Sequence, residues 1–276
     1  MASLLRSFLG SIQAMSGERL WGGDFRKKIQ LRARLAASAW NFLTSILFLF
    51  PFAILVFFHW YPAPLDSALG VGEFFWLFFL TTLALSSTCI AVVFKINKRK
   101  LFFDLMVIVL IQTSIFYFGA KTIAQGRPAF LVFVIDDFEL VREMDIRLPQ
   151  DGVIPFQYRV SLWRGTQIVA AAYSEDSKIR GQQQQDELLG GISLARDPQA
   201  YVLLSTQRAK IRSKGHELSE LRQFNEERAI ERILGLWPSA RAWLPLKATK
   251  EDKVVLVTEG GDFLAVVDLR PWMQES

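Results

Sequence analysis

Two adjacent aspartates, Asp136 and Asp137, end a short apolar run in RPAFLVFVIDDFELV, a pattern that resembles the magnesium-holding strand of a nucleotide hydrolase. Such an enzyme also needs a phosphate-cradling loop of the form G-x-x-x-x-G-K-[ST], and the sequence has none. The pair could instead hold a metal for sugar transfer, but no further oxygen ligands can be assigned to that site. We therefore expect a turn at the end of a strand, with both carboxylates exposed.

Histidine and cysteine, the other common catalytic and metal-binding side chains, are scarce in this chain. His216, in SKGHELSEL, suits the start of a helix better than a general base, and His59 lies in an aromatic cluster typical of a membrane interface. Cys89 is alone, so it can form neither an intramolecular disulfide nor a cysteine metal site. Because the sequence also lacks a G-x-S-x-G nucleophile motif, we expect no catalytic, cofactor-binding or metal-binding residues and no enzyme activity.

Three apolar runs of about 20 residues dominate the first half of the chain, at residues 40–60, 74–94 and 101–122. At 1.5 Å per residue, each can cross a hydrocarbon core roughly 30 Å thick. The first run lies far from the N-terminus and lacks a small-residue cleavage site, so we expect it to be retained rather than removed as a signal peptide. The sequence predicts a membrane protein with three transmembrane α-helices.

The distribution of lysine and arginine predicts the orientation of these helices. Seven basic residues precede the first run and four separate the second from the third, whereas residues 61–72 contain none. The positive-inside rule then places the N-terminus in the cytoplasm and, after three spans, the C-terminal part in the periplasm. The chain has 32 basic and 27 acidic residues, and the part after residue 100 contains 21 of the basic and 23 of the acidic ones. The excess positive charge therefore lies in the first 100 residues, so we expect contacts with membrane lipids and none with nucleic acid.

Polar and small residues within the spans suggest contacts between helices. Asp104 follows the basic residues 98–100 at the cytoplasmic end, where pairing or snorkelling accounts for it without a proton relay. Gln112 is near the middle of the third span, and we expect it to hydrogen-bond another helix. Small residues at spacings of three and four mark one face of the second span, which suits either the chain's own helices or a partner's helix: Ala84, Ser87, Thr88 and Ala91.

The sequence divides into a cytoplasmic N-terminal segment (1–37), a three-helix transmembrane region (38–125) and a periplasmic α+β domain with antiparallel hairpins (126–276). Apolar residues at helical spacing within residues 4–12 suit either an interfacial amphipathic helix or a partly ordered tail. In the last domain we expect a buried strand (129–135), a hairpin (156–173), a polar surface loop (174–187), a helix broken near Asn225 (218–235) and a second hairpin around Gly260 and Gly261.

Several motifs in fixed order resemble the type IV pilin accessory proteins, the TfpX/TfpZ group: WYPAPLD, VVFK, FDLMVIVLIQ, RPAFLVFVIDDFELV, LPLKA and VVDLRPW. The resemblance covers residues 60–272, with a variable middle around residues 145–200. Members of that group are inner-membrane proteins needed for normal assembly of a cognate major pilin into pili. The first 37 residues depart from the shorter start that is usual in the group.

The resemblance implies a non-enzymatic, chaperone-like factor at the bacterial inner membrane, whose partner is a type IV pilin and which also meets other pilus assembly proteins. A pilin before assembly has an apolar helix in the membrane and a head in the periplasm, so a helper needs a surface in each phase. Two alternatives remain at this point. One is a membrane-bound pilin-modifying transferase that uses Asp136 or Asp137, and the other is a structural or sensor subunit of the pilus machine.

Overall fold

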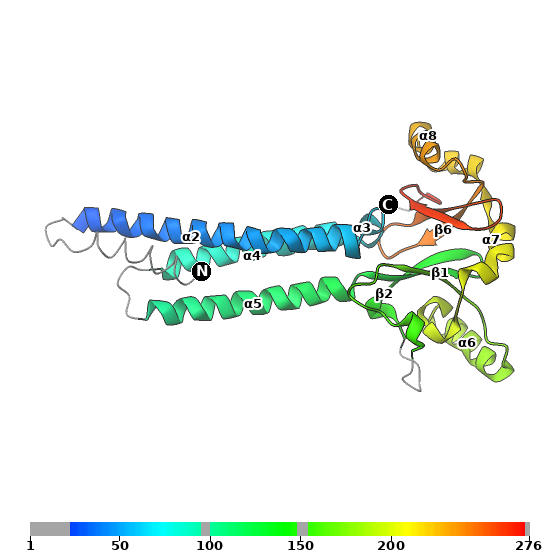
Figure 1. Cartoon of the computed structure of the whole chain (residues 1–276), viewed down its shortest axis with the longest axis horizontal. Coiled ribbons are helices and arrows are strands. Elements are labelled where there is room, and N and C mark those ends of the chain that lie inside the picture. Colours follow the sequence, from blue (N-terminus) through cyan, green and yellow to red (C-terminus); the bar gives the residue numbers. More distant parts are fainter. Residues whose placement is uncertain (1–22, 95–99, 148–153, 274–276) are drawn as a thin grey trace. The chain divides into compact units, whose positions relative to one another are not determined.

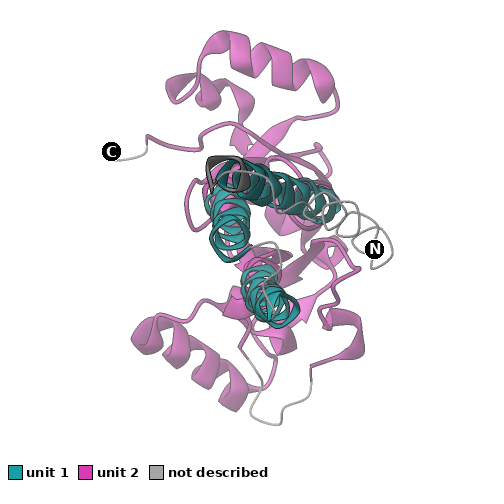
Figure 2. Cartoon of the chain, turned by 90° about the vertical axis from the view of Figure 1, so that its left-hand side faces the viewer, with its two compact units in different colours: residues 1–53, 74–121 teal, residues 54–73, 122–276 magenta. Residues whose placement is uncertain are grey.

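The computed structural model describes residues 23–94, 100–147 and 154–273. The chain forms two compact units, each assembled from two stretches of sequence (Figure 2). Unit 1 comprises Met1–Ala53 and Phe74–Lys121, and unit 2 comprises Ile54–Glu73 and Thr122–Ser276. The sequence placed the start of the C-terminal domain at residue 126, whereas the structure adds the link between the first two spans to the same unit.

Unit 1 is built mainly from three long helices: α2 (Gly23–Ile54), α4 (Val71–Val93) and α5 (Leu101–Gln125). Among the described residues, three helical stretches are long and apolar enough to cross a membrane, at Lys27–Trp60, Val71–Val93 and Leu101–Gln125, as predicted. The first helix begins well before the apolar run, since its polar start also lies in α2. The expected amphipathic stretch at residues 4–12 lies outside the described residues.

The helices of unit 1 pack through small and aromatic residues. Ser38 Oγ donates a 2.9 Å hydrogen bond to the Ser87 carbonyl, which brings α2 against α4 at the small-residue face of the second span. At this position the chain's own first span is therefore the neighbour. Farther along, the rings of Phe52 and Phe116 meet edge to face with their centres 5.3 Å apart, which joins α2 to α5.

The first span ends in a different helical geometry. Pro51 lies inside α2, where it has no N–H to donate to the carbonyl of the preceding turn. Beyond it, Leu55–Trp60 forms the π-helix η1, and the Tyr61 N–H donates to the Val56 carbonyl at 2.8 Å. A short helix, α3 (Leu65–Leu69), follows within unit 2.

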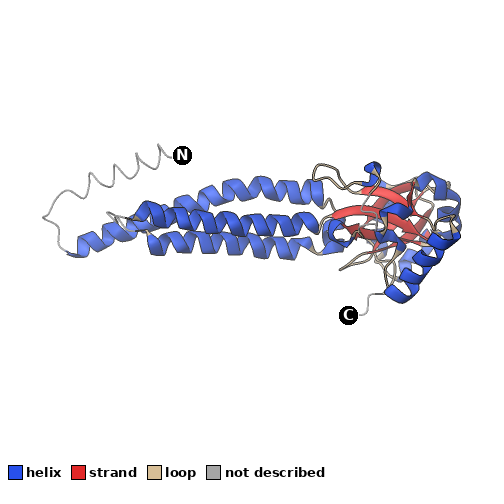
Figure 3. Cartoon of the chain, turned by 90° about the horizontal axis from the view of Figure 1, so that it is seen from below, coloured by secondary structure: helices blue, strands red, loops and turns tan. Residues whose placement is uncertain are grey.

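The described part of unit 2 contains one eight-stranded mixed sheet, drawn in red in Figure 3. The strands run in the spatial order β4-β3-β1-β2-β6-β7-β8, and β5 pairs with β6. The β1–β3 and β2–β6 pairs are parallel and the other pairs are antiparallel. The strands are β1 (Pro128–Val134), β2 (Asp137–Arg142), β3 (Gln167–Ala171), β4 (Tyr201–Val202), β5 (His216–Glu217), β6 (Ala242–Lys247), β7 (Lys253–Val257) and β8 (Phe263–Val267).

The apolar run before the two aspartates forms β1, and all seven of its residues are buried. Leu131 and Phe133 pack into the core on one face of the sheet, and Phe130 and Val132 pack into a second core. Because side chains alternate across a strand, a strand covered on both faces reads as an unbroken apolar run. The predicted buried strand is confirmed, and so is the terminal hairpin, as β7 and β8.

Two predictions in the middle of unit 2 are wrong. The expected strand at residues 156–162 is instead a short 3-10 helix, η3 (Phe156–Tyr158), followed by irregular chain, and β3 pairs with β1 and β4. The expected polar loop is the helix α6 (Ser177–Gly190). Asp176 caps it by accepting the N–H groups of Lys178 and Ile179 at 2.8 and 3.2 Å, which favours a helix start at this position.

The helix expected at residues 218–235 forms in two pieces, η7 (Leu218–Gln223) and α8 (Glu227–Leu236), as the break near Asn225 predicted. Asn225 fills the break, where its amide donates to the Leu221 carbonyl at 3.0 Å. Figure 1 shows α6, α7 and α8 around the sheet. The remaining helical elements of unit 2 are η2 (Glu143–Asp145), η4 (Leu194–Arg196), η5 (Pro198–Ala200), η6 (Leu204–Gln207) and α7 (Arg208–Lys214).

Candidate functional site

The two aspartates have different surroundings. Asp136 is exposed in the turn between β1 and β2, whereas Asp137 is the first residue of β2 and is only 8% exposed. The carboxylate of Asp137 forms an ion pair with Lys247 of β6. Burial raises the pKa of Asp137 above that of an ordinary carboxyl, and the hydrogen bond from Lys247 opposes this effect. The prediction that both carboxylates are exposed is therefore wrong for Asp137.

A second carboxylate of β2 lies farther along the strand. Ser193 Oγ donates to Glu139 Oε1 at 2.6 Å, and burial raises the pKa of Glu139. Glu139 is opposite Lys247 in the register of β2 and β6. These carboxylates therefore have protein partners. In the described ranges of the chain, no group of three or more His, Cys, Asp or Glu side chains is placed to hold a metal ion.

The two histidines have separate surroundings. His216 belongs to β5, immediately before η7, and its ring stacks on Trp243 with the centres 4.7 Å apart. Its Nδ1 is 3.4 Å from a carboxylate oxygen of Glu220. His59 lies in η1, and its buried Nε2 has no hydrogen-bond partner within the described residues. No nucleophile is placed beside either ring by these contacts.

The partners expected for the polar residues Asp104 and Gln112 of the third span are only partly tested by the structure. Asp104 lies in the first turn of α5, where a carboxylate is favoured by the helix dipole, and part of the expected basic partner lies outside the described residues. The buried Nε2 of Gln112 has no hydrogen-bond partner in the described chain, so the expected bond is not made to another helix of this chain. Cys89 is a half-buried free thiol.

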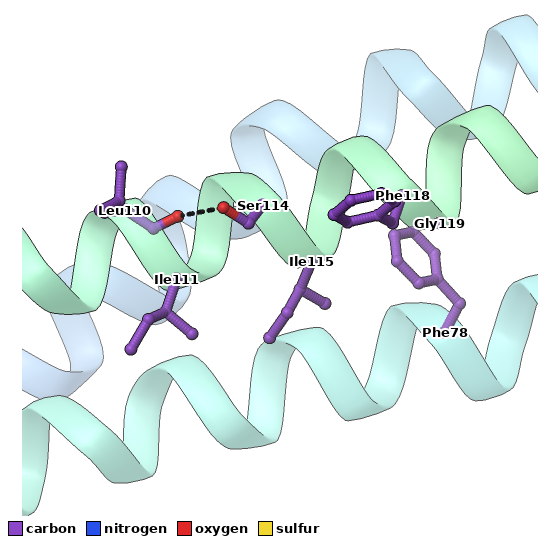
Figure 4. Close-up of a pocket in the computed structure, with 7 residues that line it drawn as sticks. All are labelled: Phe78, Leu110, Ile111, Ser114, Ile115, Phe118 and Gly119. Carbon is purple, nitrogen blue, oxygen red and sulfur yellow. Dashed lines mark hydrogen bonds between the residues drawn. The ribbon is translucent and has the colours of Figure 1, made fainter.

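A shallow apolar groove runs along α5 in unit 1, with a volume of about 510 Å³ (Figure 4). Gly119 lets α5 approach α4 closely, since a Cβ at this position would lie 2.1 Å from the ring of Phe78. Leu110 and Phe118 are 67% and 65% exposed, so the groove opens outward from the helices. The groove is lined by Phe78, Leu110, Ile111, Ser114, Ile115, Phe118 and Gly119.

The link between the first two spans is a structural part of unit 2. Leu65 and Ala68 of α3 are buried in the same core cluster as Leu131 of β1. The Ala68 carbonyl accepts the backbone N–H groups of Lys250 and Glu251 at 3.0 and 3.2 Å. Because these contacts hold the link against the sheet, the link and the C-terminal domain lie on the same side of any membrane that the helices cross.

This docking was not predicted from the sequence, where WYPAPLD served only as a motif of the family resemblance. Its available signal was the pair Leu65 and Ala68, spaced three residues apart as on one face of a helix. Tyr61, two residues after His59, was also given no specific contact from the sequence. Its hydroxyl donates to the Ile123 carbonyl at 2.7 Å and so joins the ends of the first and third spans.

A polar hollow of about 260 Å³ lies beside the start of β7, next to the VVDLRPW motif. The side chain of Lys253 is 5% exposed, and its Nζ is 2.6 Å from Asp268 and 2.8 Å from Glu251. Burial alone would lower the pKa of Lys253, but these two carboxylates raise it above its ordinary value. The side chain of Asn225 closes the hollow through two 2.8 Å hydrogen bonds with the backbone of Arg270.

Comparison with known proteins gives three relatives, all from Dichelobacter nodosus. The chain is 25% identical over 182 residues to the fimbrial assembly protein of serogroup I and, likewise, to that of serogroup E1, covering 65% of this chain and 70% of each relative. It is 29% identical over 112 residues to the fimbrial assembly protein of serogroups C1 and C2, covering 40% of this chain and 86% of the relative. No family model and no solved structure matches. These similarities support a relationship to a fimbrial assembly family.

Proposed function

We propose that this protein is a non-enzymatic, chaperone-like accessory factor that assists the stability or assembly of a cognate type IV pilin at the bacterial inner membrane. The similarity to fimbrial assembly proteins over 65% of the chain carries this proposal, because it supports a role in pilus assembly. The resemblance of the ordered motifs to the TfpX/TfpZ group supplies the finer role. Three membrane-capable helices and a sheet domain fit a helper that contacts the pilin helix within the membrane and the pilin head outside it.

In the proposed orientation, the N-terminus is cytoplasmic and unit 2 is periplasmic. The concentration of Lys and Arg before the first span and between the second and third spans supports this orientation. The docking of α3 into the sheet domain is consistent with it, because two spans separate the link from the C-terminal domain and two crossings return the chain to the same side.

The groove on α5 is our candidate for contact with the apolar helix of the pilin. It is apolar and open, and Gly119 keeps α4 and α5 close at one end of it. Helices associate in membranes largely through shape and van der Waals packing, so a groove offers more contact to a second helix than a convex face does. Other pilus assembly proteins could meet the remaining helix faces.

For the pilin head, our candidate surface is β8, the last strand in the order of the sheet. An edge strand can pair with an extended segment of another chain through its backbone groups. The opposite edge is the two-residue strand β4, which offers much less backbone for pairing. The longer edge is therefore the better candidate.

The proposed role requires no catalytic group. The transferase alternative relied on Asp136 and Asp137, and the ion pair of Asp137 with Lys247 gives its carboxylate a structural role. The double substitution Asp136→Asn and Asp137→Asn distinguishes the two functions. A transferase would lose pilin modification, whereas the helper would still support pilus assembly if its fold survives, which the amount of membrane-inserted protein measures.

Site-specific photo-crosslinking in cells that make the pilin tests the proposed function. A photoreactive phenylalanine at Ile111, in the groove, should crosslink to pilin, and the same residue at Val109 provides a control on the same helix, since the two positions are 51% and 57% exposed. A probe at Phe263 of β8 should also capture pilin. Absence of a pilin adduct at both Ile111 and Phe263 would overturn the proposed mechanism.

A further inference from the structure

An irregular loop in unit 2, residues 154–166, exposes large apolar side chains. Phe156 is 79% exposed, Trp163 is 78% exposed and Leu162 is 47% exposed. Exposed aromatic residues grouped on one loop mark a surface that meets something other than water. The neighbouring Tyr158 points the other way, since it is buried with its ring 5.3 Å from that of Tyr201.

Hydrogen bonds fix this loop to the chain where it leaves the membrane. The indole Nε1 of Trp60 donates to the Leu162 carbonyl at 2.9 Å, and Trp60 is the last residue of the first membrane-capable helix. At the other end of the loop, Thr166 Oγ1 donates to the Pro128 carbonyl at 3.2 Å, three residues beyond the end of α5. All four residues belong to unit 2, so the loop is held at the level where the first and third spans end.

The charges of the loop are of one sign. Arg159 and Arg164 are exposed, and residues 154–166 contain no Asp or Glu. The Arg159 guanidinium lies 5.8 Å from the centre of the Phe156 ring, and Arg164 donates to the Gln157 carbonyl at 3.1 Å. Arginine beside exposed aromatic rings is the composition of a segment that lies in the headgroup layer of a bilayer containing anionic lipids.

We propose that residues 156–164 form a membrane-interface anchor that inserts Phe156, Leu162 and Trp163 into the headgroup layer of the membrane the helices span, with Arg159 and Arg164 on anionic phospholipid headgroups. A tryptophan at the end of a span lies at the boundary between hydrocarbon and headgroups. Because Trp60 is hydrogen-bonded to Leu162, the loop lies at the same boundary, and the lipid surface is the partner that its exposed side chains meet. The anchor fixes one face of the sheet domain to the bilayer, and it does not depend on the proposed role in pilus assembly.

Spin-label accessibility in the full-length chain tests this anchor. The chain carries Cys89→Ser and a single label at Trp163→Cys or, independently, at Phe156→Cys, in vesicles of phosphatidylethanolamine and phosphatidylglycerol. Phe48→Cys, 69% exposed and near the middle of the apolar run of α2, gives the reference within the membrane. Ser213→Cys on α7 gives the aqueous reference, since α7 and α3 lie at opposite ends of unit 2 (Figure 1).

We expect the ratio of oxygen to nickel-chelate accessibility at both loop positions to lie between the two references. The added substitutions Arg159→Gln and Arg164→Gln should shift the ratio at Trp163→Cys toward the aqueous value. Ratios equal to that of Ser213→Cys at both loop positions would show that the loop lies in water and overturn the proposal. Low accessibility to both reagents would show burial against protein, such as a second copy of the chain, and would overturn it equally.

Discussion

The hydroxyl of Tyr61 donates a 2.7 Å hydrogen bond to the backbone carbonyl of Ile123, which ties the chain leaving the first span to the last turn of α5. Carbonyls in the last turn of a helix have no partner within the helix, so this bond satisfies one of them. Both residues are 2% exposed, so water cannot readily replace the lost donor in a Tyr61→Phe variant.

We expect Tyr61→Phe to lower the free energy of unfolding by about 1–3 kcal/mol, the usual cost of leaving a buried polar group unpaired. Thermal unfolding in detergent measures this loss. Tyr117→Phe is the matched control on α5, where the side chain is 59% exposed, and it should change the midpoint little. Equal midpoints for Tyr61→Phe and the control would contradict the assigned role.

The buried carboxyl of Glu139 should make stability depend on pH. Burial raises its pKa, so the folded chain holds its proton at pH values where the unfolded chain has released it. The stability contribution is therefore full below the ordinary carboxyl pKa and is lost as the pH rises through the raised value. Denaturant unfolding between about pH 4 and about pH 7 should show a shallower decline for Glu139→Gln than for the wild type. An unchanged slope would refute this, and Glu259→Gln at an exposed position serves as the control.

Removing the two carboxylates that pair with Lys253 should lower the free energy of unfolding more than removing the lysine itself. The ammonium is buried, whereas the side chains of Asp268 and Glu251 are 71% and 44% exposed. The double variant Asp268→Asn and Glu251→Gln strands a buried charge, which costs about 3–5 kcal/mol in comparable sites. Lys253→Met leaves only carboxylates that water can solvate, so its loss should be smaller. Measured unfolding free energies in the opposite order would contradict this account of the cluster.

The proposed orientation predicts the activity of reporter fusions. Alkaline phosphatase folds only outside the cytoplasm, so a fusion after residue 276 should be active and a fusion within residues 95–100 should be inactive. Because α3 packs into the C-terminal domain, residues 61–72 lie on the same side of the membrane as that domain, so a fusion there should be active too. Such a fusion would also disturb the core at Leu65. An inactive C-terminal fusion on a stably inserted protein would show that the number of spans or the charge interpretation is wrong.

The parts of the fold that the sequence predicted depend on local pattern. Hydropathy summed over some 20 residues identifies a span, and the turn residues around Gly260 and Gly261 identify the β7–β8 hairpin. The break at Asn225 was equally local, because an amide side chain competes with the helix for backbone hydrogen bonds. The capping residue Asp176 was also a local signal, but the polar sequence after it favoured a loop in our interpretation.

The parts that could not be predicted depend on distant partners. Asp137 is buried because β6, far along the chain, pairs with β2 and supplies Lys247. The docking of α3 depends on Lys250 and Glu251, and no short pattern around Leu65 specifies those partners. For the same reason, motif matching assigned no role to the link between the first two spans, although it is part of the domain core.

Deletion of the gene, followed by measurement of surface pili and cellular pilin, tests the proposed function most directly. The account predicts that pili are lost or greatly reduced, that the other assembly proteins remain at normal levels, and that the full-length chain restores pili when supplied in trans. Normal pili and normal pilin in the deletion strain would contradict the proposed role.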